Sequence, residues 1–185
     1  MKKAAELIEQ LLLLRCQMGD KDAFAELIER YERPLRYFIN RLLDNSELTE
    51  DIFQDTWLTV ISRIYSLREI DAFPAWLYRI ARNKVYQQHR KKKTEVKLDE
   101  NITVENHAED DDFSGEDAAK IHKGLKKLPL EYREVLMLRF LEQMSYEQIS
   151  QVLNCKLGTV RSRIYYAKIA LKEELEKYKW TKRKI

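Results

Sequence analysis

Apolar residues in the first part of the chain recur at steps of three and four, and this spacing constrains the fold more than any other feature. The stripe consists of Phe24, Leu27, Ile28, Tyr31, Leu35, Phe38, Ile39 and Leu42. It predicts an α-helix with one face packed against other helices. Because the 185 residues contain only 4 Gly and 3 Pro, we expect an all-α chain. Pro34 predicts a kink in this helix or its break into two.

Two further helices are expected in the same region. One should start after Asn45, with Ser46 as its N-cap, and run to about Tyr65. Its predicted core face carries Phe53, Trp57, Val60, Ile61 and Ile64, and a second, acidic face carries Asp51 and Asp55. The next helix should begin at Phe73, since Pro74 suits a first helical turn. It would bury Phe73, Trp76, Leu77 and Ile80 and present a basic, aromatic-bearing face formed by Arg79, Arg82, Asn83, Tyr86 and Arg90.

Charge is segregated along the chain, although the net charge is only +3. Residues 79–93 include seven basic side chains and no acidic one, whereas residues 94–117 include ten acids against Lys97. The acidic stretch has little helical periodicity, which is typical of a flexible linker. We therefore expect two small helical domains, 1–93 and 119–185, joined by an acidic linker over residues 94–118.

The second domain contains a predicted helix-turn-helix. Ser145 and Gln148 have the spacing of a capping box, which opens a short helix with Tyr146, Ile149 and Val152 inside. After a turn, a second helix from Leu157 carries Val160, Ile164, Ala167 and Leu171 on one face. Such a helix fits the major groove of DNA. The side chains expected to contact DNA are Arg161, Ser162, Arg163, Tyr165, Tyr166 and Lys168.

Several classes of protein are disfavoured. Cys16 and Cys155 lie far apart and the three histidines stand alone, so neither a disulfide framework nor a zinc site is indicated, and no cofactor is expected. The apolar stretch at residues 11–14 is too short for membrane insertion or a signal sequence, so we expect a cytoplasmic protein. No Gly-rich phosphate cradle or Ser/His/Asp set accompanies Asp51 and Asp55, so catalysis is not expected.

These motifs, in this order across an acidic linker, resemble the extracytoplasmic-function (ECF) sigma factors of the sigma-70 family. The second conserved domain of that family is similar to the segments that hold Asp22, Phe24, Leu27, Tyr31, Asp51, Gln54, Asp55, Trp57, Leu58, Phe73, Trp76, Arg79, Arg82 and Asn83. The fourth is similar to the segments that hold Leu128, Pro129, Arg133, Leu136, Arg139, Ser145, Ile149, Gly158, Arg161 and Arg163.

The resemblance implies a non-enzymatic subunit that brings core RNA polymerase to a set of promoters. Asp51, Gln54 and Asp55 would dock on the clamp helices of the largest polymerase subunit. The helix carrying Trp76, Arg79 and Asn83, together with the loop 66–71, would capture the melted non-template strand of the minus-ten element.

In the other domain, Arg161, Ser162 and Tyr165 would read the duplex minus-thirty-five element. That domain would also meet the flap of the other large subunit, and the linker would thread toward the active-site and RNA-exit channels. An anti-sigma factor is the usual further partner.

The chain departs from the family pattern at two places. Tyr166 stands where many relatives have a basic residue, and the loop 66–71 lacks their glycine. Two other interpretations stay open on the sequence: a helix-turn-helix regulator that binds duplex operators without being a polymerase subunit, and a helical adaptor whose charged faces bind only proteins.

Overall fold

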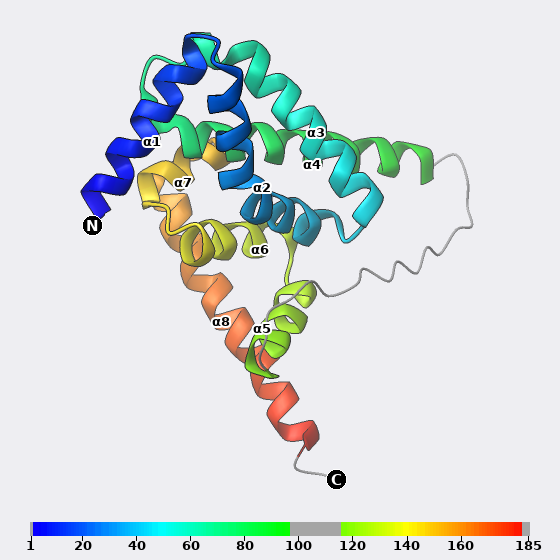
Figure 1. Cartoon of the computed structure of the whole chain (residues 1–185). Coiled ribbons are helices and arrows are strands. Elements are labelled where there is room, and N and C mark those ends of the chain that lie inside the picture. The colour runs from blue at the N-terminus through cyan, green and yellow to red at the C-terminus, as the bar shows by residue number, and fades with distance from the viewer. Residues whose placement is uncertain (1, 97–115, 183–185) are drawn as a thin grey trace. The chain divides into compact units, whose positions relative to one another are not determined.

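The computed structural model describes residues 2–96 and 116–182, and within these ranges the chain is helical with no strand (Figure 1). The predicted all-α class is confirmed. The chain divides into two compact units, Met1–Asn106 and His107–Ile185, which are described one at a time. Among the described residues, no helix is both long and apolar enough to span a membrane.

The first unit consists of α1 (Lys2–Gln17), α2 (Lys21–Leu43), α3 (Ser46–Arg63), the short 3-10 turns η1 (Ile64–Ser66) and η2 (Ile70–Ala72), and α4 (Phe73–Val96). The apolar face of α2 packs against α1, α3 and α4. Phe38 of α2 meets Tyr78 of α4 edge to face, with ring centroids 5.1 Å apart. Tyr31 meets Phe73 in the same way at 5.5 Å. Such aromatic pairs fix the angle between two helices as well as burying area.

Pro34 does not break α2, which is one helix from Lys21 to Leu43. Of the two outcomes predicted for Pro34, a kink or a break, the break into two helices is therefore wrong. Buried side chains on both sides of the proline, Tyr31 and Leu35, belong to the same core. Their burial stabilises helical backbone across a position that lacks one hydrogen bond.

The N-cap of α3 is Asn45 and not the predicted Ser46. The Asn45 Oδ1 accepts a hydrogen bond from the Leu48 backbone N–H at 2.9 Å, and Asn45 itself has extended backbone angles. An amide oxygen at this position serves the first turn as well as a hydroxyl does. The sequence offered two adjacent capping residues, and the first one caps the helix.

Several residues predicted to face the core are only partly covered, among them Phe24 and Ile28 in α2 and Tyr146 and Leu171 in the second unit. Ile61 is 40 % exposed, and Trp76 and Ile80 are half-buried. The fully buried row of α4 is formed by Phe73, Leu77, Tyr78, Ala81 and Val85. Trp76 and Ile80 flank that row, so each presents part of its surface outward.

The second unit consists of α5 (Glu116–Lys127), α6 (Leu130–Leu136), the π-helical turn η3 (Met137–Leu141), α7 (Tyr146–Leu153) and α8 (Leu157–Lys182). The predicted capping box is confirmed: Ser145 Oγ accepts from the Gln148 backbone N–H at 3.1 Å, and Gln148 Oε1 accepts from the Ser145 N–H at 2.9 Å. Asn154 ends α7 in the left-handed region with φ of 50°. Helix α8 then packs on α5, α6 and α7.

Helices extend into both ends of the predicted linker. Helix α4 continues to Val96 and α5 begins at Glu116, so helical backbone extends about one turn inside each of the predicted linker bounds, 94 and 118. The remainder of the predicted linker, 97–115, lies outside the described residues.

A tight joint connects α1 to α2. Gly19 has a φ of 83°, which glycine adopts without strain. Asp20 caps α2 by accepting from the backbone N–H groups of Asp22 and Ala23, at 3.0 and 3.1 Å. Arg15 of α1 contacts the other oxygen of Asp20 at 2.7 Å. The Ala23 N–H, followed by the Arg15 guanidinium, lowers the pKa of Asp20 below its ordinary value of 3.8.

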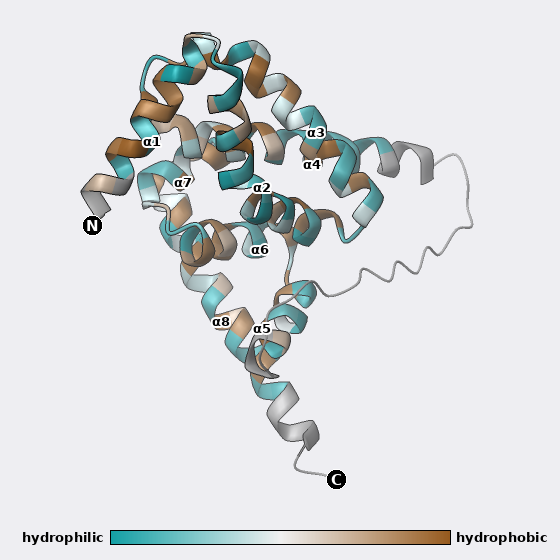
Figure 2. Ribbon diagram, viewed as in Figure 1, coloured by the Kyte–Doolittle hydropathy of each residue, from teal (hydrophilic) through white to brown (hydrophobic). Residues whose placement is uncertain are grey.

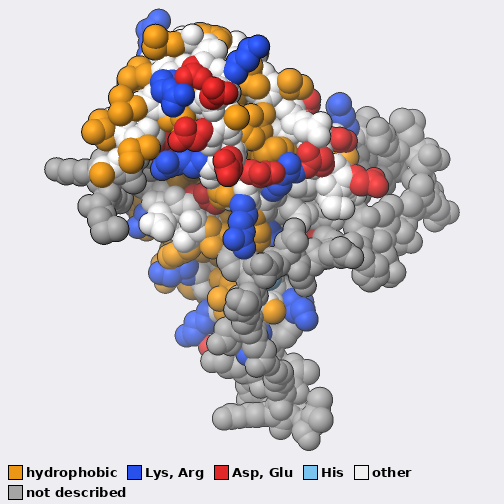
Figure 3. Space-filling model, viewed as in Figure 1, with side chains coloured by type: hydrophobic (Ala, Val, Ile, Leu, Met, Phe, Trp, Pro, Cys, Tyr) orange, Lys and Arg blue, Asp and Glu red, His pale blue; other side chains and the backbone are white. Residues whose placement is uncertain are grey.

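The side of α1 that faces away from the core is apolar and exposed (Figures 2 and 3). Its exposed residues include Leu7, Leu11, Leu14 and, just beyond the helix, Met18. The inner side contributes Leu12, Leu13 and Cys16 to the core. Burial raises the pKa of the Cys16 thiol to about 11, so this cysteine stays protonated and unreactive near neutral pH.

The joint predicts a pH-dependent stability. Asp20→Ala should lower the urea midpoint of unfolding at neutral pH, since it removes the cap and the ion pair. Because the folded-state pKa of Asp20 is lowered, its contribution is complete above the ordinary value and is lost as pH falls through the folded value. The difference between the two proteins should therefore shrink in acid. Asp22→Ala is the control, and an equal, pH-independent loss in both variants would contradict the assignment.

Candidate nucleic-acid interface

The outer side of α8 brings together most of the residues that the sequence assigned to duplex DNA. Arg161, Ser162 and Lys168 are exposed, and Tyr165 and Tyr166 are 63 % and 56 % exposed. The two tyrosine rings meet edge to face at 5.3 Å. The pKa of Glu147 is lowered by hydrogen bonds from its own backbone N–H and the Ser145 side chain, and to a smaller extent by the charge of Arg161. The Arg161 side chain is nevertheless exposed and can reach a ligand, and two exposed aromatic rings lie one helical turn further along.

Arg163 points to another side of the same helix. Its guanidinium lies 3.4 Å from a carboxylate oxygen of Glu131 and 4.0 Å from one of Glu134, both on α6. Glu134 is fully buried. Two residues along a helix correspond to a rotation of about 200°, so Arg161 and Arg163 cannot share a face. Spacing along the helix separates the two arginines, but only the tertiary structure shows that Arg163 faces a buried carboxylate.

The predicted basic face of α4 forms a line along that helix. Arg79, Asn83 and Arg90 are exposed, while Trp76, Arg82 and Tyr86 are half-buried. The Arg82 guanidinium carbon lies 4.3 Å from the centre of the Tyr86 ring, a cation–π contact. A row of guanidinium groups, an amide and flat rings suits a nucleic-acid strand whose bases are unpaired.

The acidic residues predicted to bind the polymerase are all exposed on α3. Asp55 approaches Lys84 of α4, with 3.5 Å between the carboxylate oxygen and Nζ, yet its side chain remains 67 % exposed. Gln54 donates a hydrogen bond to Glu50 at 2.8 Å, and Glu50 also contacts Arg36. Asp51, Gln54 and Asp55 therefore form one accessible surface, which we call the acidic face.

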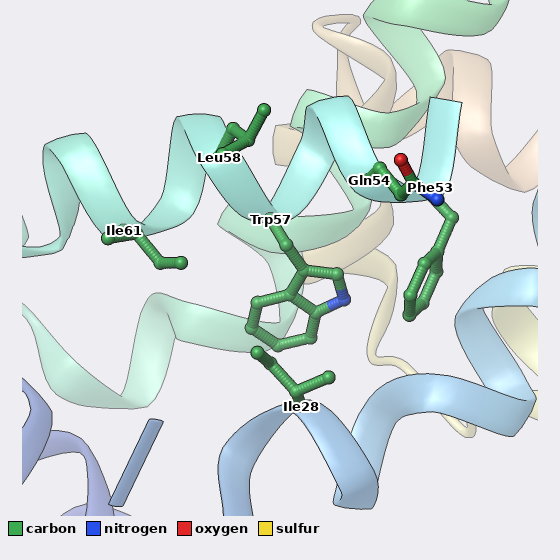
Figure 4. Close-up of a pocket in the computed structure, with 6 residues that line it drawn as sticks. All are labelled: Ile28, Phe53, Gln54, Trp57, Leu58 and Ile61. Carbon is green, nitrogen blue, oxygen red and sulfur yellow. The ribbon is translucent and has the colours of Figure 1, made fainter. Parts of the chain in front are cut away.

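An apolar groove adjoins the acidic face. It has a volume of about 330 Å³ and is lined by Ile28, Phe53, Gln54, Trp57, Leu58 and Ile61. Figure 4 shows the Trp57 indole hanging from α3 toward Ile28 of α2. The Trp57 Nε1–H is buried without a hydrogen-bond partner among the described residues. Gln54 belongs to both the groove and the acidic face, so one partner could contact both.

Sequence reasoning missed this groove. The available signal was Leu58, which follows Gln54 by four residues and Asp51 by seven and so stands on the polar side of α3. It is 65 % exposed. The contribution of Ile28 comes from another helix, and no local pattern predicts it.

The described residues contain no group of three or more His, Cys, Asp or Glu side chains that could hold a metal ion. His89 instead contacts the Leu42 carbonyl oxygen through Nε2 at 3.1 Å, near the end of α2. His89 therefore contributes to the contact between α4 and α2.

The first unit has a basic, aromatic-bearing helix and the second has a helix-turn-helix. Comparison with known proteins identifies this combination as a DNA-binding protein of the transcription machinery. Residues 27–95 match the family Sigma-70 region 2, and residues 118–171 match Sigma-70 region 4. Helix α1 lies outside both matches.

Full-length relatives agree with these matches. The chain is 31 % identical to the ECF RNA polymerase sigma factor SigW of Bacillus subtilis over 183 residues, which cover 92 % of this chain and 98 % of the relative. It is 33 % identical to the RNA polymerase sigma-H factor of Pseudomonas aeruginosa over 182 residues, which cover 91 % and 94 %. The chain belongs to the ECF sigma factors of the sigma-70 family.

A solved structure supports the assignment at the level of fold. The sigma factor RpoE of Bartonella quintana, in complex with the anti-sigma factor NepR, matches with a TM-score of 0.75 at 29 % identity, over 83 % of this chain and 96 % of that one. As a member of this family, the protein directs promoter recognition by RNA polymerase and is a non-catalytic subunit.

The two arginines of α8 provide a matched test of the site. Arg163→Ala should lower the free energy of unfolding of the second unit by about 1–3 kcal/mol, since it withdraws a cation from the buried Glu134. Arg161→Ala should leave stability unchanged because its side chain is exposed. Urea unfolding followed by circular dichroism measures both, and a loss shared equally by the two variants would show that the ion pair has no special role.

Proposed function

We propose that this ECF sigma factor divides its work among three surfaces. The acidic face docks on the clamp helices of the largest polymerase subunit, the basic face of α4 with the loop 66–71 captures the melted non-template strand of the minus-ten element, and the outer side of α8 reads the duplex minus-thirty-five element. The observation that carries the proposal is that each surface is exposed and has the chemistry its partner requires.

The acidic face suits a basic protein helix. Asp51 and Asp55 are four residues apart, and such like-charged pairs cost an isolated helix a few tenths of a kcal/mol. Lys84 offsets part of this at Asp55 but lies 3.5 Å away on another helix. A basic partner would neutralise both carboxylates, and the adjoining groove would take an apolar side chain from the same partner.

The strand-capturing role follows from the rings and cations of α4. Trp76 exposes part of its indole beside Arg79 and Asn83, so a flipped base could stack and bond to an amide in one place. Stacking on aromatic rings is worth about 1–3 kcal/mol per base. The Arg82 and Tyr86 contact holds a further ring and cation along the path of the backbone.

The α8 surface combines one specific contact with less specific ones. Arg161 has the geometry for two hydrogen bonds to guanine, the commonest base-specific contact. Tyr165 and Tyr166 add stacking or apolar contact, and Tyr166 does so where many relatives have a basic residue. Lys168 lies three residues beyond Tyr165 and suits a phosphate. Because Arg163 faces Glu131 and Glu134, we leave it out of the base-reading set.

Further partners follow by similarity. An anti-sigma factor is proposed because RpoE of Bartonella quintana was solved in complex with one. The flap of the other large subunit is proposed to meet the second unit, where Phe140 and Leu141 expose 56 % and 44 % of their surface. A sigma factor meets its polymerase in the cytoplasm, so that location belongs to the proposal. An operator-binding regulator or a protein-only adaptor does not account for both family matches.

Charge reversal tests the docking surface. Asp51→Arg with Asp55→Arg should abolish binding to core polymerase while helical circular dichroism stays unchanged, because the introduced cations repel a basic partner. Glu6→Arg with Glu29→Arg makes the same change in net charge at exposed positions elsewhere and should bind normally. The measurement is a pull-down of core polymerase, and normal binding by the first double variant would refute docking at the acidic face.

Base readout is tested on α8. Arg161→Ala should lose discrimination of about 1–3 kcal/mol at one or two base pairs of the minus-thirty-five element, because a bidentate contact to guanine disappears. Lys168→Ala should weaken all promoters alike and reduce the salt dependence of binding. Transcription by reconstituted holoenzyme from a library randomised over that element measures both. If Arg161→Ala lowers output evenly and keeps the preferred bases, Arg161 contacts only the backbone.

A further inference from the structure

Two side-chain amides of α1 hold the loop between α3 and α4, and the first of them belongs to Gln17. The side chain of Gln17 donates from Nε2 to the carbonyl oxygens of Ile64 and Leu67, at 3.0 and 2.8 Å. These carbonyls mark the two ends of the η1 turn. The amide is part-buried, so water does not easily replace it.

A second glutamine of α1 holds the far end of the loop. Gln10 donates from Nε2 to a carboxylate oxygen of Asp71 at 2.6 Å. Gln10 and Gln17 are seven residues apart, two helical turns, and so lie on the same side of α1. Together they span the loop from Ile64 to Asp71.

The loop has little support of its own. Within it, the Leu67 N–H donates to the Ile64 carbonyl and the Ala72 N–H to the Glu69 carbonyl, at 3.1 and 3.0 Å. No side chain caps either 3-10 turn, and Ile64 is the one buried residue of those two turns. Such short turns are marginal without outside contacts.

Helix α1 is in turn fixed to the core. The Arg15 and Asp20 ion pair closes its joint with α2. Tyr31 of α2 donates a hydrogen bond to Glu9 of α1, and Arg30 lies 3.1 Å from the same carboxylate. The two glutamines therefore project from a rigid support toward a weakly structured loop.

We propose that Gln17 and Gln10 are positioning residues that hold the loop 64–72 in the conformation that captures the melted minus-ten strand. The inference rests on the proposed role of residues 66–71, the central part of this loop, in strand capture. It assigns a promoter-related task to α1, which lies outside the residues that match Sigma-70 region 2. The glutamines touch no DNA themselves, and they act by keeping the loop ordered before the strand arrives.

The first test removes the donor and keeps the volume. Gln17→Met should speed hydrogen exchange at the amides of Leu67 and Ala72 in the free chain. Holoenzyme with Gln17→Met should bind a single-stranded minus-ten oligonucleotide roughly thirtyfold more weakly, the factor that corresponds to the loss of two hydrogen bonds of about 1 kcal/mol each. Binding to core polymerase and base preference at the minus-thirty-five element should not change. Gln151→Met, on the exposed side of α7, is the control and should bind the oligonucleotide normally.

The second test exchanges the hydrogen-bond donor and acceptor between positions 10 and 71. Gln10→Glu places two carboxylates together and should weaken oligonucleotide binding. Adding Asp71→Asn supplies an amide that can donate to the new carboxylate, so the double variant should recover most of the loss. Rescue of this kind reports a direct coupling between the two side chains.

Asn83→Ala separates the possible failures. If Asn83→Ala weakens oligonucleotide binding but Gln17→Met does not, α1 has no positioning role while the proposed function stands. If neither variant weakens it, the strand-capture role of this region is wrong and the inference falls with it. Unchanged hydrogen exchange in Gln17→Met, or a matching loss of core polymerase binding, would also overturn the inference, because the glutamine would then either not order the loop or act on the whole unit.

Discussion

The packing of α2 against three other helices is the constraint on which the first unit depends. Its apolar side fixes α1, α3 and α4, so the outer sides of those helices become the functional surfaces. Edge-to-face contacts of Phe38 with Tyr78 and of Tyr31 with Phe73 set how α4 lies on α2. The acidic face and the basic face of α4 are thus placed by side chains that the proposed partners would not touch.

In the second unit, a contact between charged side chains contributes to the position of α8. Glu134 is fully buried and the guanidinium of Arg163 approaches it from the recognition helix. A buried carboxylate without a cation is costly, so the position of α8 relative to α6 is tightly specified. The neighbouring Arg161 is then presented outward. Arg163 thus contributes to the packing of α8 on α6, and Arg161, two residues earlier, lies on the exposed side of the same helix.

Local pattern predicted those parts of the structure that depend on local chemistry. The stripe of α2, the start of α4 at Phe73 and the capping box of Ser145 and Gln148 all follow from spacing within one helix. The features that local pattern did not predict are of a different kind. Continuity of α2 through Pro34, the contacts of Arg163 with α6 and the groove lined by Ile28 depend on contacts between segments far apart in the chain. The choice of Asn45 over Ser46 was a matter of one residue between two good caps.

The buried indole N–H of Trp57, which has no hydrogen-bond partner among the described residues, lowers the stability of the unassembled protein. A buried donor without an acceptor costs about 1–3 kcal/mol, and this cost falls at the groove beside the acidic face. A partner that covered the exposed Leu58 and Ile61 of this groove would remove apolar surface from water and offset that cost, so the fold would gain stability from assembly. A copy that has not found its partner would unfold more readily and meet proteases sooner. The cellular lifetime of the protein would then follow the supply of its partner.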